Sequence, residues 1–333
     1  MKGSLKDYHQ IIEKFSQAKV GVLGDLIADM YVFGSPNRLS REAPIVVIEY
    51  ESEELRPGGA ANSAHNLAAL GASVFPVGVV GDDKEGRLLK EILCRGKVAP
   101  EGIFTEPGRE TITKTRIFAG DLHTVKQQMA RIDRGKAQKI DSSLEKKIFD
   151  AIENFSRETS AWIISDYGYG LITDRIREKV KSLFPQRIVV ADSRHAAREF
   201  GGITAMTPNE SEALAFGRDF LSGEDDIFII GEKILEALNL RTALITRGNK
   251  GMLLFERGAR PVEIPIVGTE EIVDVSGAGD TVTATFTLAL ASGASSEQSA
   301  HLANFAASVV VMKRGTATCS VDELLQTVTK YFS

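Results

Sequence analysis

The stretch Asp274-Val275-Ser276-Gly277-Ala278-Gly279-Asp280 is the most informative feature of this 333-residue chain. A carboxylate stands at each end, small residues fill the middle, and an apolar, helix-like run follows at once. The amides of Gly277, Ala278 and Gly279 can crowd around an anion, and a helix that starts here adds the positive end of its dipole. Asp280 would lie beside a bound phosphate and could accept a proton from an attacking hydroxyl. The pattern predicts a phosphoryl-transfer site with its general base; an ordinary strand-to-helix turn is the alternative.

Short apolar runs alternate with helix-period segments over most of the chain. The expected strands are residues 20–23, 74–80, 161–165, 188–191, 243–246 and 252–255. The expected helices are residues 60–70, 85–93, 144–154, 174–183, 231–238, 281–291 and 298–312, the last opened by a capping box of Ser295 and Gln298. This alternation predicts an α/β fold with a doubly wound, mostly parallel sheet and helices on both faces.

Two stretches, about residues 29–51 and 103–133, break the alternation. They contain β-rich segments such as 45–48 and 111–117 with no helix between the strands. We expect them to form a small antiparallel sheet that projects from the main domain as a lid over an active site, and ordinary surface hairpins are the alternative. Because no linker or internal repeat stands out, residues 1–333 are expected to form a single domain.

The composition excludes several functional classes. With 43% hydrophobic and 26% charged residues the chain reads as a soluble globular protein, and its net charge of -5 argues against a nucleic-acid partner. Two cysteines, Cys94 and Cys319, and the lack of a signal-peptide pattern predict a cytoplasmic protein. The longest apolar runs are too short to cross a membrane, and the scattered histidines form no metal pattern.

Polar residues near two turns are candidates for sugar contacts. Gly58 and Gly59 give a turn that a ligand can approach closely, and the Asn62 amide both donates and accepts, which suits sugar hydroxyls; a tight turn capped by small residues is the alternative. Asp29 follows the first strand near the end where open α/β sheets bind ligands, and it can take two hydroxyls of a polyol. Asp25 is either part of the same site or a turn residue.

A second group of residues suits a nucleotide and its metal. Asn209 and Glu212 stand three apart at an expected helix start, where an amide oxygen and a carboxylate can act as outer ligands of hydrated Mg²⁺. Helix capping is the alternative for this pair. Thr246 ends a strand just before Gly248, and the two can present a hydroxyl and backbone to nucleotide phosphates. Walker A, GxGxxG and GxSxG patterns are absent, which disfavours P-loop kinases, dinucleotide dehydrogenases and α/β-hydrolases.

Taken together, these motifs make the chain similar to the ribokinase-like (PfkB) carbohydrate kinases along nearly its whole length. The resemblance rests on Gly58-Gly59 with Asn62, on residues 209–212, and on residues 274–280. It implies a doubly wound α/β domain with a β-sheet lid and ATP-dependent phosphorylation of a sugar hydroxyl.

The resemblance also implies roles for single residues. Asp280 would be the base, with an anion hole formed by the amides of Gly277, Ala278 and Gly279. Asn209 and Glu212 would organise Mg²⁺ and the phosphates. Asn304 matches an asparagine near the adenine pocket, and Asp274 with residues 315–319 would border a monovalent-cation site, for example for K⁺.

A closer resemblance is to the kinase module of bacterial heptose-7-phosphate kinases, which make heptose 1,7-bisphosphate for lipopolysaccharide precursors. The segments that carry it are residues 38–44, 56–62, 113–116, 131–133 and 165–167. One departure is Asp192-Ser193-Arg194, where that family commonly has Asp-Pro-Lys. Among the basic residues of these segments we expect some to bind the distal phosphate of the acceptor, namely Arg38, Lys114, Arg116 and Arg131.

The sequence therefore predicts an ATP- and Mg²⁺-dependent kinase that phosphorylates the anomeric hydroxyl of D-glycero-D-manno-heptose 7-phosphate. Another sugar or nucleoside kinase of the same family is the alternative, and a catalytically silent sugar-sensing protein on this fold is the non-enzyme alternative. Exposed lid strands often pair between subunits, so a homodimer through the lid is expected.

Overall fold

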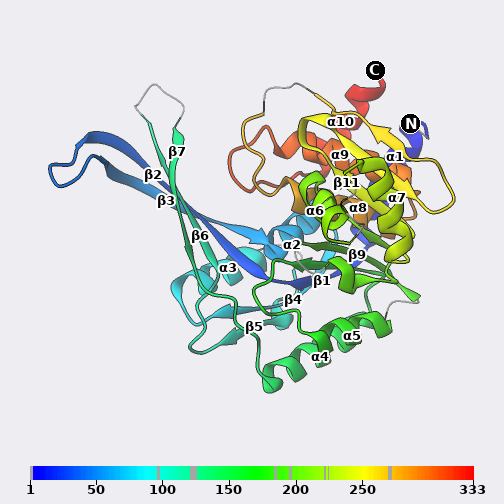
Figure 1. Ribbon diagram of the computed structural model, residues 1–333, viewed down its shortest axis with the longest axis horizontal. Helices are drawn as coiled ribbons and strands as arrows, with labels where there is room; N and C mark the ends of the chain where they lie inside the picture. The colour runs from blue at the N-terminus through cyan, green and yellow to red at the C-terminus, as the bar shows by residue number, and fades with distance from the viewer. Residues whose placement is uncertain are drawn as a thin grey trace.

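The computed structural model describes residues 3–95, 98–120, 126–183, 186–194, 197–220, 223, 225–268 and 272–333. Within these residues, nine strands form one central sheet in the order β13-β12-β11-β10-β9-β8-β1-β4-β5 (Figure 1). The strands are β1 (Lys19–Gly24), β4 (Ser73–Gly81), β5 (Ile103–Glu106), β8 (Ala161–Asp166), β9 (Ile188–Ser193), β10 (Ala205–Met206), β11 (Thr242–Thr246), β12 (Met252–Glu256) and β13 (Val262–Ile264). Only β12 pairs antiparallel with its neighbours, which confirms the mostly parallel sheet.

Helices cover both faces of this sheet, as predicted. One apolar core lies between one face and α1 (Leu5–Glu13), α2 (Ala60–Ala69), α3 (Lys84–Cys94), α8 (Ala278–Ala291), α9 (Ser296–Val310) and α10 (Val321–Phe332). A second core lies between the other face and α4 (Ser142–Ser156), α5 (Asp174–Leu183), α6 (Glu210–Phe220) and α7 (Ile227–Ala237). The central strands are buried on both sides, so they read as continuous apolar runs rather than as alternating patterns.

The sheet has its switch point between β1 and β8. From β1 the chain proceeds outward to β4 and β5, and it then crosses over to β8 and continues outward in the opposite direction. In open α/β sheets, ligands bind beyond the carboxyl ends of the strands at such a point. The segments that leave β1 and β8 there begin at Asp25 and Tyr167, and the Asp25 N–H donates to the Ser165 carbonyl (3.1 Å) across the gap.

A second sheet projects from the body as the expected lid (Figure 1). Its strands β2 (Leu26–Leu39), β3 (Val46–Gly59), β6 (Thr113–Ala119) and β7 (Gln127–Arg134) lie in the order β3-β2-β6-β7. The predicted antiparallel pairing is present between β2 and β3 and between β6 and β7, whereas β2 and β6 pair in parallel. These two strands leave the body in the same direction, and α2, β4, α3 and β5 lie between them in the chain.

The predicted boundaries of the lid also need correction. Residues 103–106 form β5, which pairs with β4 in the central sheet, so the second lid segment begins at Thr113 rather than at residue 103. The first segment is longer than expected, since β2 and β3 together extend from Leu26 to Gly59. Residues 121–125 of the predicted lid lie outside the described residues.

The helix boundaries matter most at α8. The sequence predicted a start at Thr281, but α8 begins at Ala278 with Gly277 as its N-cap, which puts Asp280 inside the first turn. The capping box of Ser295 and Gln298 is confirmed at the start of α9. Two further helices, α1 and α10, were not predicted. In the described part of the chain, no helix combines the length and the apolar character that a membrane span requires.

Close packing between β1 and β8 gives a test of the fold. A Cβ added to Gly21 would lie 2.4 Å from the ring of Trp162, which is the only tryptophan of the chain and is buried. We expect Gly21→Ala to lower the free energy of unfolding by about 1–3 kcal/mol, the range for overpacked cores. Urea unfolding followed by circular dichroism measures this. Gly201→Ala is the control, because its added carbon makes only ordinary contact at 3.4 Å; equal stability of the two variants would contradict the packing argument.

Candidate active site

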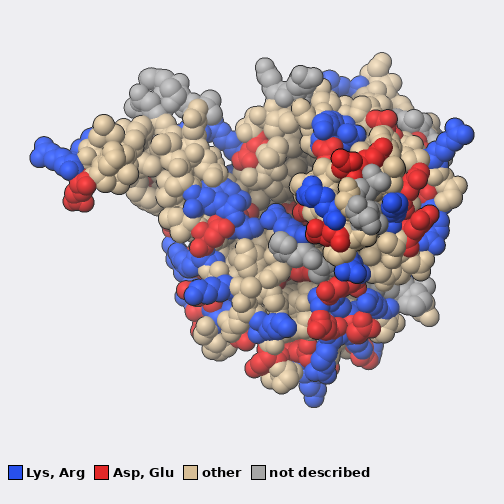
Figure 2. Space-filling model, in the orientation of Figure 1, with Lys and Arg blue, Asp and Glu red and all other residues tan. Residues whose placement is uncertain are grey.

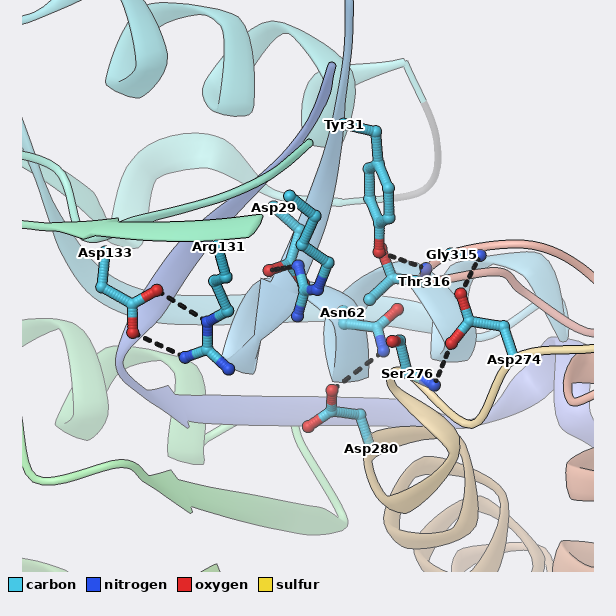
Figure 3. A network of polar contacts seen from close by, with 11 residues as sticks. Asp29, Tyr31, Asn62, Arg131, Asp133, Asp274, Ser276, Asp280, Gly315 and Thr316 are labelled. Carbon is cyan, nitrogen blue, oxygen red and sulfur yellow. Dashed lines mark hydrogen bonds and ion pairs between the residues drawn. The ribbon is translucent and has the colours of Figure 1, made fainter. Parts of the chain in front are cut away.

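Asp280 is buried in the first turn of α8 and holds two hydrogen bonds through its carboxylate. The Asn62 side-chain amide donates to Oδ2 (2.9 Å), and the Tyr167 hydroxyl donates to Oδ1 (2.8 Å). Figure 3 shows Asn62 reaching from α2 toward Asp280. The two donors fix the orientation of the carboxylate, and each oxygen keeps a lone pair for a further proton donor.

The environment of Asp280 suits a general base. Burial raises the pKa of Asp280 to about 6, while the hydrogen bonds from Asn62 and Tyr167 act to lower it. Nearby charges act more weakly, Asp29 raising the pKa and Lys114 lowering it. A carboxylate with this pKa is mostly ionised at neutral pH and still basic enough to take a proton from a hydroxyl.

The small residues before Asp280 leave amides available for an anion. The N–H of Ala278 donates to the Val275 carbonyl (3.2 Å), whereas those of Gly277 and Gly279 have no acceptor among the described residues. Gly277 adopts a φ of 76°, which favours glycine, and a Cβ there would lie 2.5 Å from the Asn62 amide nitrogen. Of the three amides that the sequence predicted for an anion hole, those of Gly277 and Gly279 are free among the described residues and that of Ala278 is bonded within the turn. The anion hole itself stays a prediction.

A mainly apolar cleft of about 160 Å³ adjoins these amides. Three of the predicted nucleotide-binding residues, Thr246, Gly248 and Asn304, line it together with Ala278 and Gly279. The remaining walls are largely aliphatic, namely Met252, Ile266, Val267, Ile272, Val275, Val282, Ala307 and Val311. Aliphatic walls of this kind can take a flat aromatic base, and a nucleotide in this cleft stays a prediction.

Asn209 and Glu212 form a reciprocal cap at the start of α6. The Glu212 N–H donates to Asn209 Oδ1 (2.9 Å), and the Asn209 N–H donates to Glu212 Oε2 (2.9 Å). The capping alternative is therefore present in the structure. The charge of Glu212 is nevertheless felt in the site, because burial and the charges of Asp280 and Glu212 raise the pKa of Asp192 well above its usual range. A cation beside these groups would relieve their repulsion.

Two predicted sugar-binding residues pair with each other. The Arg116 guanidinium lies 2.6 Å from the Asp29 carboxylate, and both side chains are largely buried. The adjacent glycine makes room for this pair, because a Cβ on Gly58 would lie 2.5 Å from Asp29 Oδ2. Gly59, with a φ of 56°, is the N-cap of α2. The two glycines thus have packing roles inside the site, and their expected contact with a ligand stays a prediction.

Lys114 differs from its neighbours because its charge is not paired. Its side chain is buried, its ammonium lies 5.0 Å from the centre of the Tyr167 ring, and no carboxylate of the described residues is within ion-pair distance. Burial lowers the pKa of Lys114, and the charge of Asp29 opposes this by raising it. The positive charges of Arg194, Arg131 and Arg116 lower the pKa further. An anionic ligand would supply the missing partner.

The other predicted cations differ in position. Arg131 is on the same lid face but makes a two-point ion pair with Asp133 (2.7 and 2.6 Å; Figure 3). Arg38 is exposed and lies nine positions beyond Asp29 on β2, about 30 Å along the strand, so it does not reach this site. Arg194, which follows β9, lies 4.6 Å from the centre of the Tyr167 ring. Figure 2 shows basic and acidic side chains together where the lid meets the body.

Asp274 holds two loops together. Its carboxylate accepts hydrogen bonds from the N–H groups of Ser276 (2.8 Å) and Gly315 (2.9 Å; Figure 3). From the lid, the Tyr31 hydroxyl accepts the Thr316 N–H (2.9 Å). A monovalent cation beside Asp274 and residues 315–319 stays a prediction.

Sequence reasoning missed two residues of this site. Tyr167 was noted only as part of a resembling segment, and Asp25 was left open between a ligand and a turn residue. In the structure Tyr167 contacts Asp280, and Asp25 Oδ2 accepts the N–H groups of Tyr167 (2.9 Å) and Tyr169 (3.1 Å). The available signal was positional, since both residues follow strands that flank the switch point.

Residues 17–323 match the family model described as pfkB family carbohydrate kinase. The chain belongs to the pfkB family of carbohydrate kinases. As a member of this family it is a phosphotransferase that acts on a sugar.

Relatives of this pfkB-family kinase include proteins named bifunctional protein HldE. That of Geobacter sulfurreducens is 37% identical over 91% of this chain and 61% of its own length. That of a Caulobacter species is 39% identical over 93% of this chain and 63% of its own length. The chain therefore spans less than two thirds of the length of these curated relatives.

Solved structures share the fold of this kinase. A ribokinase of Arabidopsis thaliana, complexed with ribose and ATP, has a TM-score of 0.72 at 23% identity, covering 93% of this chain and 98% of its own. Phosphofructokinase-2 of Escherichia coli, in complex with substrates and products, has a TM-score of 0.76 at 17% identity, covering 94% of this chain and 99% of its own. These similarities confirm the ribokinase-like α/β fold.

The position of Asp280 leads to a prediction about catalysis. Asp280→Asn removes the proton acceptor but keeps the shape of the side chain, so kcat should fall by about 10²-fold or more while ATP binding changes little. Steady-state kinetics and nucleotide titration measure the two quantities. Asp322→Asn is a matched control, because Asp322 is an exposed acid in the first turn of another helix, α10. Near wild-type kcat in Asp280→Asn would rule out the assignment.

Proposed function

We propose that this chain transfers the γ-phosphoryl group of ATP to the anomeric hydroxyl of D-glycero-D-manno-heptose 7-phosphate, giving the 1,7-bisphosphate and ADP. The observation that carries the proposal is the unpaired, buried ammonium of Lys114 on the lid face above Asp280, in a site whose base and anion hole suit phosphoryl transfer. The resemblance of residues 38–44, 56–62, 113–116, 131–133 and 165–167 to heptose-7-phosphate kinases supports the choice of sugar.

The proposed reaction is a direct displacement. Asp280 accepts the proton of the anomeric hydroxyl as the sugar oxygen forms its bond to the γ-phosphorus. The bond between that phosphorus and the β–γ bridging oxygen breaks, and ADP leaves with the electron pair. The amides of Gly277 and Gly279 stabilise the charge on the transferred group, so positioning and charge neutralisation contribute more than the strength of the base.

The residues near Glu212 fit a hydrated Mg²⁺ ion. Burial raises the pKa of Asp192 well above its usual range, and the negative charges of Asp280 and Glu212 act in the same direction, so negative charge gathers around Asp192. Mg²⁺ keeps several of its waters and binds through one or two carboxylates and the phosphates of its nucleotide. In this proposal Glu212, together with Asn209, holds the ion through water, and the ion neutralises charge on the phosphates.

The acceptor phosphate would bind between the lid and the segment after β9. Lys114 and Arg194 both lie close to the ring of Tyr167, at 5.0 and 4.6 Å from its centre, and neither has a carboxylate partner among the described residues. Arg131 and Arg116 add positive potential, although each is paired with an aspartate. A phosphate dianion suits such a cluster, with Arg donating in pairs and Lys acting as a point charge.

We further infer a cytoplasmic enzyme that forms a homodimer through the lid. The supporting observation is that apolar side chains on the lid are exposed, among them Leu39, Ile45, Tyr50 and Ile132 at 57% or more. Pairing between lid strands of two copies would cover such side chains.

Discrimination between a sugar phosphate and its free sugar tests the proposal. The wild-type kinase should show a much higher kcat/KM for heptose 7-phosphate than for the unphosphorylated heptose. Lys114→Ala should remove about 1.5–3 kcal/mol of this preference, the range for hydrogen bonds to charged groups, and leave the free sugar almost unaffected. An assay of ADP release on both substrates measures the effect.

Lys126→Ala is the matched control for Lys114→Ala. Lys126 is also a lysine of the lid region, but its charge is paired with Glu51, so its loss should leave the preference unchanged. Equal turnover of the phosphorylated and free sugars by the wild type would favour another pfkB sugar or nucleoside kinase. Tight ligand binding without any turnover across a panel of sugars would favour the sugar-sensing alternative.

Glu212→Gln separates metal binding from helix capping. Glutamine can replace glutamate in a capping box, because its amide oxygen still accepts the Asn209 N–H, but it carries no charge. If Glu212 holds Mg²⁺, the variant should need a several-fold higher Mg²⁺ concentration for half-maximal rate at unchanged thermal stability. An identical Mg²⁺ titration for Glu212→Gln and wild type would leave Glu212 with only its capping role.

A further inference from the structure

The loop that follows β8 is anchored by two buried carboxylates. Asp25 Oδ2 accepts the N–H groups of Tyr167 (2.9 Å) and Tyr169 (3.1 Å). Asp166 Oδ1 accepts the Gly168 N–H (3.0 Å), and its Oδ2 accepts the Ser193 hydroxyl (3.1 Å). Both aspartates are at most 6% exposed. Charged acceptors that bind several backbone amides hold a loop more firmly than neutral ones, so the path of this loop is fixed.

This anchored loop presents one side chain to the base. The Tyr167 hydroxyl donates to Asp280 Oδ1 over 2.8 Å, opposite the Asn62 amide on Oδ2. Burial and the charge of Asp280 raise the pKa of Tyr167 well above its usual range, so the phenol keeps its proton and can only donate to Asp280. The ring is further held by the cations of Lys114 and Arg194, at 5.0 and 4.6 Å from its centre.

We propose that Tyr167 is a positioning residue for the general base, fixing the orientation of the Asp280 carboxylate through its hydroxyl, and that Asp25 anchors the loop that delivers Tyr167. The inference rests on the proposed function only in taking Asp280 as the base. Asn62 holds one carboxylate oxygen and Tyr167 the other. Loss of either donor leaves the carboxylate free to rotate and deprives a buried charge of part of its solvation.

The charged groups around Asp280 define the expected direction of the effect. Asp29 from β2 and Lys114 from β6 face it, Asp192 at the end of β9 couples to it, and the hydroxyl of Tyr167 stabilises its ionised form. Burial raises the pKa of Asp280 and the hydrogen bond from Tyr167 lowers it, so without that hydroxyl the pKa should rise from about 6. Because the base must be ionised, the acid side of the pH–rate profile should move to higher pH.

The direct test is a titration of the Asp280 carboxyl carbon by NMR in protein labelled with ¹³C-carboxyl aspartate. The Asp280 signal is assigned by its loss in Asp280→Asn, and the Asp25 signal, whose pKa is also raised by burial to about 6, by its loss in Asp25→Asn. Tyr167→Phe should raise the Asp280 midpoint by about one pH unit, as expected for losing a hydrogen bond to a charged group.

Kinetics supply an independent readout. If the Asp280 midpoint rises by about one pH unit, a smaller fraction of the base is ionised at pH 6 in Tyr167→Phe than in the wild type. The loss of kcat in Tyr167→Phe should therefore be about fivefold greater at pH 6 than at pH 8, with KM for ATP unchanged. Tyr169→Phe is the matched control, because it removes a phenol hydroxyl from the same loop and should leave the Asp280 midpoint where it is. An unchanged midpoint in Tyr167→Phe would overturn the proposal.

The anchoring role of Asp25 is tested by a double-mutant cycle. Asp25→Asn should lower kcat when it is introduced into the wild type. Introduced into Tyr167→Phe, it should lower kcat further by less than about twofold, because both changes act through one hydrogen bond. Equal losses in the two backgrounds would show that Asp25 does not act through Tyr167. If the wild type phosphorylates a different sugar, the proposed substrate is wrong. The NMR titration needs no substrate and still decides the role of Tyr167.

Discussion

The burial of one carboxylate, that of Asp280, is the constraint on which the arrangement of this site depends. An ionised carboxylate loses much of its solvation when buried, and the protein must replace it with donors and a favourable field. The N-terminus of α8 supplies the field, while Asn62 and Tyr167, which are 218 and 113 positions away in the chain, supply the donors. Three distant segments therefore have to meet at the switch point between β1 and β8, and the double winding of the sheet is what brings them there.

The basic side chains of the lid fall into two groups, arginines that are paired with aspartates and a lysine that is not. On the lid, Asp29 of β2 neutralises Arg116 of β6 and so joins these two neighbouring strands, whereas Asp133 neutralises Arg131 within the single strand β7. Lys114 stands in the same row of the sheet, directly between Asp29 and Asp133 in register, yet neither aspartate is bonded to it. The acidic residues of this row thus pair with the arginines, and the buried ammonium of Lys114 keeps no carboxylate partner among the described residues.

Features that local sequence patterns encode were predicted correctly. Features that depend on pairing between segments far apart in the chain were not. The apolar runs of the central strands and the glycine-rich start of α8 are local signals, so the parallel sheet and most of its helices were predicted correctly. The parallel pairing of β2 with β6 depends on segments separated by α2, β4, α3 and β5, and the four-residue β5 has no pattern that assigns it to either sheet. The hydrogen bonds that Asn62 and Tyr167 donate to Asp280 join distant segments, so no local pattern predicted them, and the contact of Asn62 with a sugar stays a prediction.

The lid and the nucleotide side of the site are joined through one short loop. Asp274, at the start of the segment that leads into α8, accepts the N–H of Gly315, and the neighbouring Thr316 N–H is bound by the hydroxyl of Tyr31 from the lid strand β2. Gly315 has a φ of 68°, and a Cβ there would lie 2.8 Å from the Tyr31 ring, so the contact requires glycine. The same loop thus touches the strand that carries Asp29 and the turn that carries the anion hole. Residues 315 and 316 therefore bind the lid strand β2 through Tyr31 and the segment before α8 through Asp274, so one loop connects the lid to the start of α8.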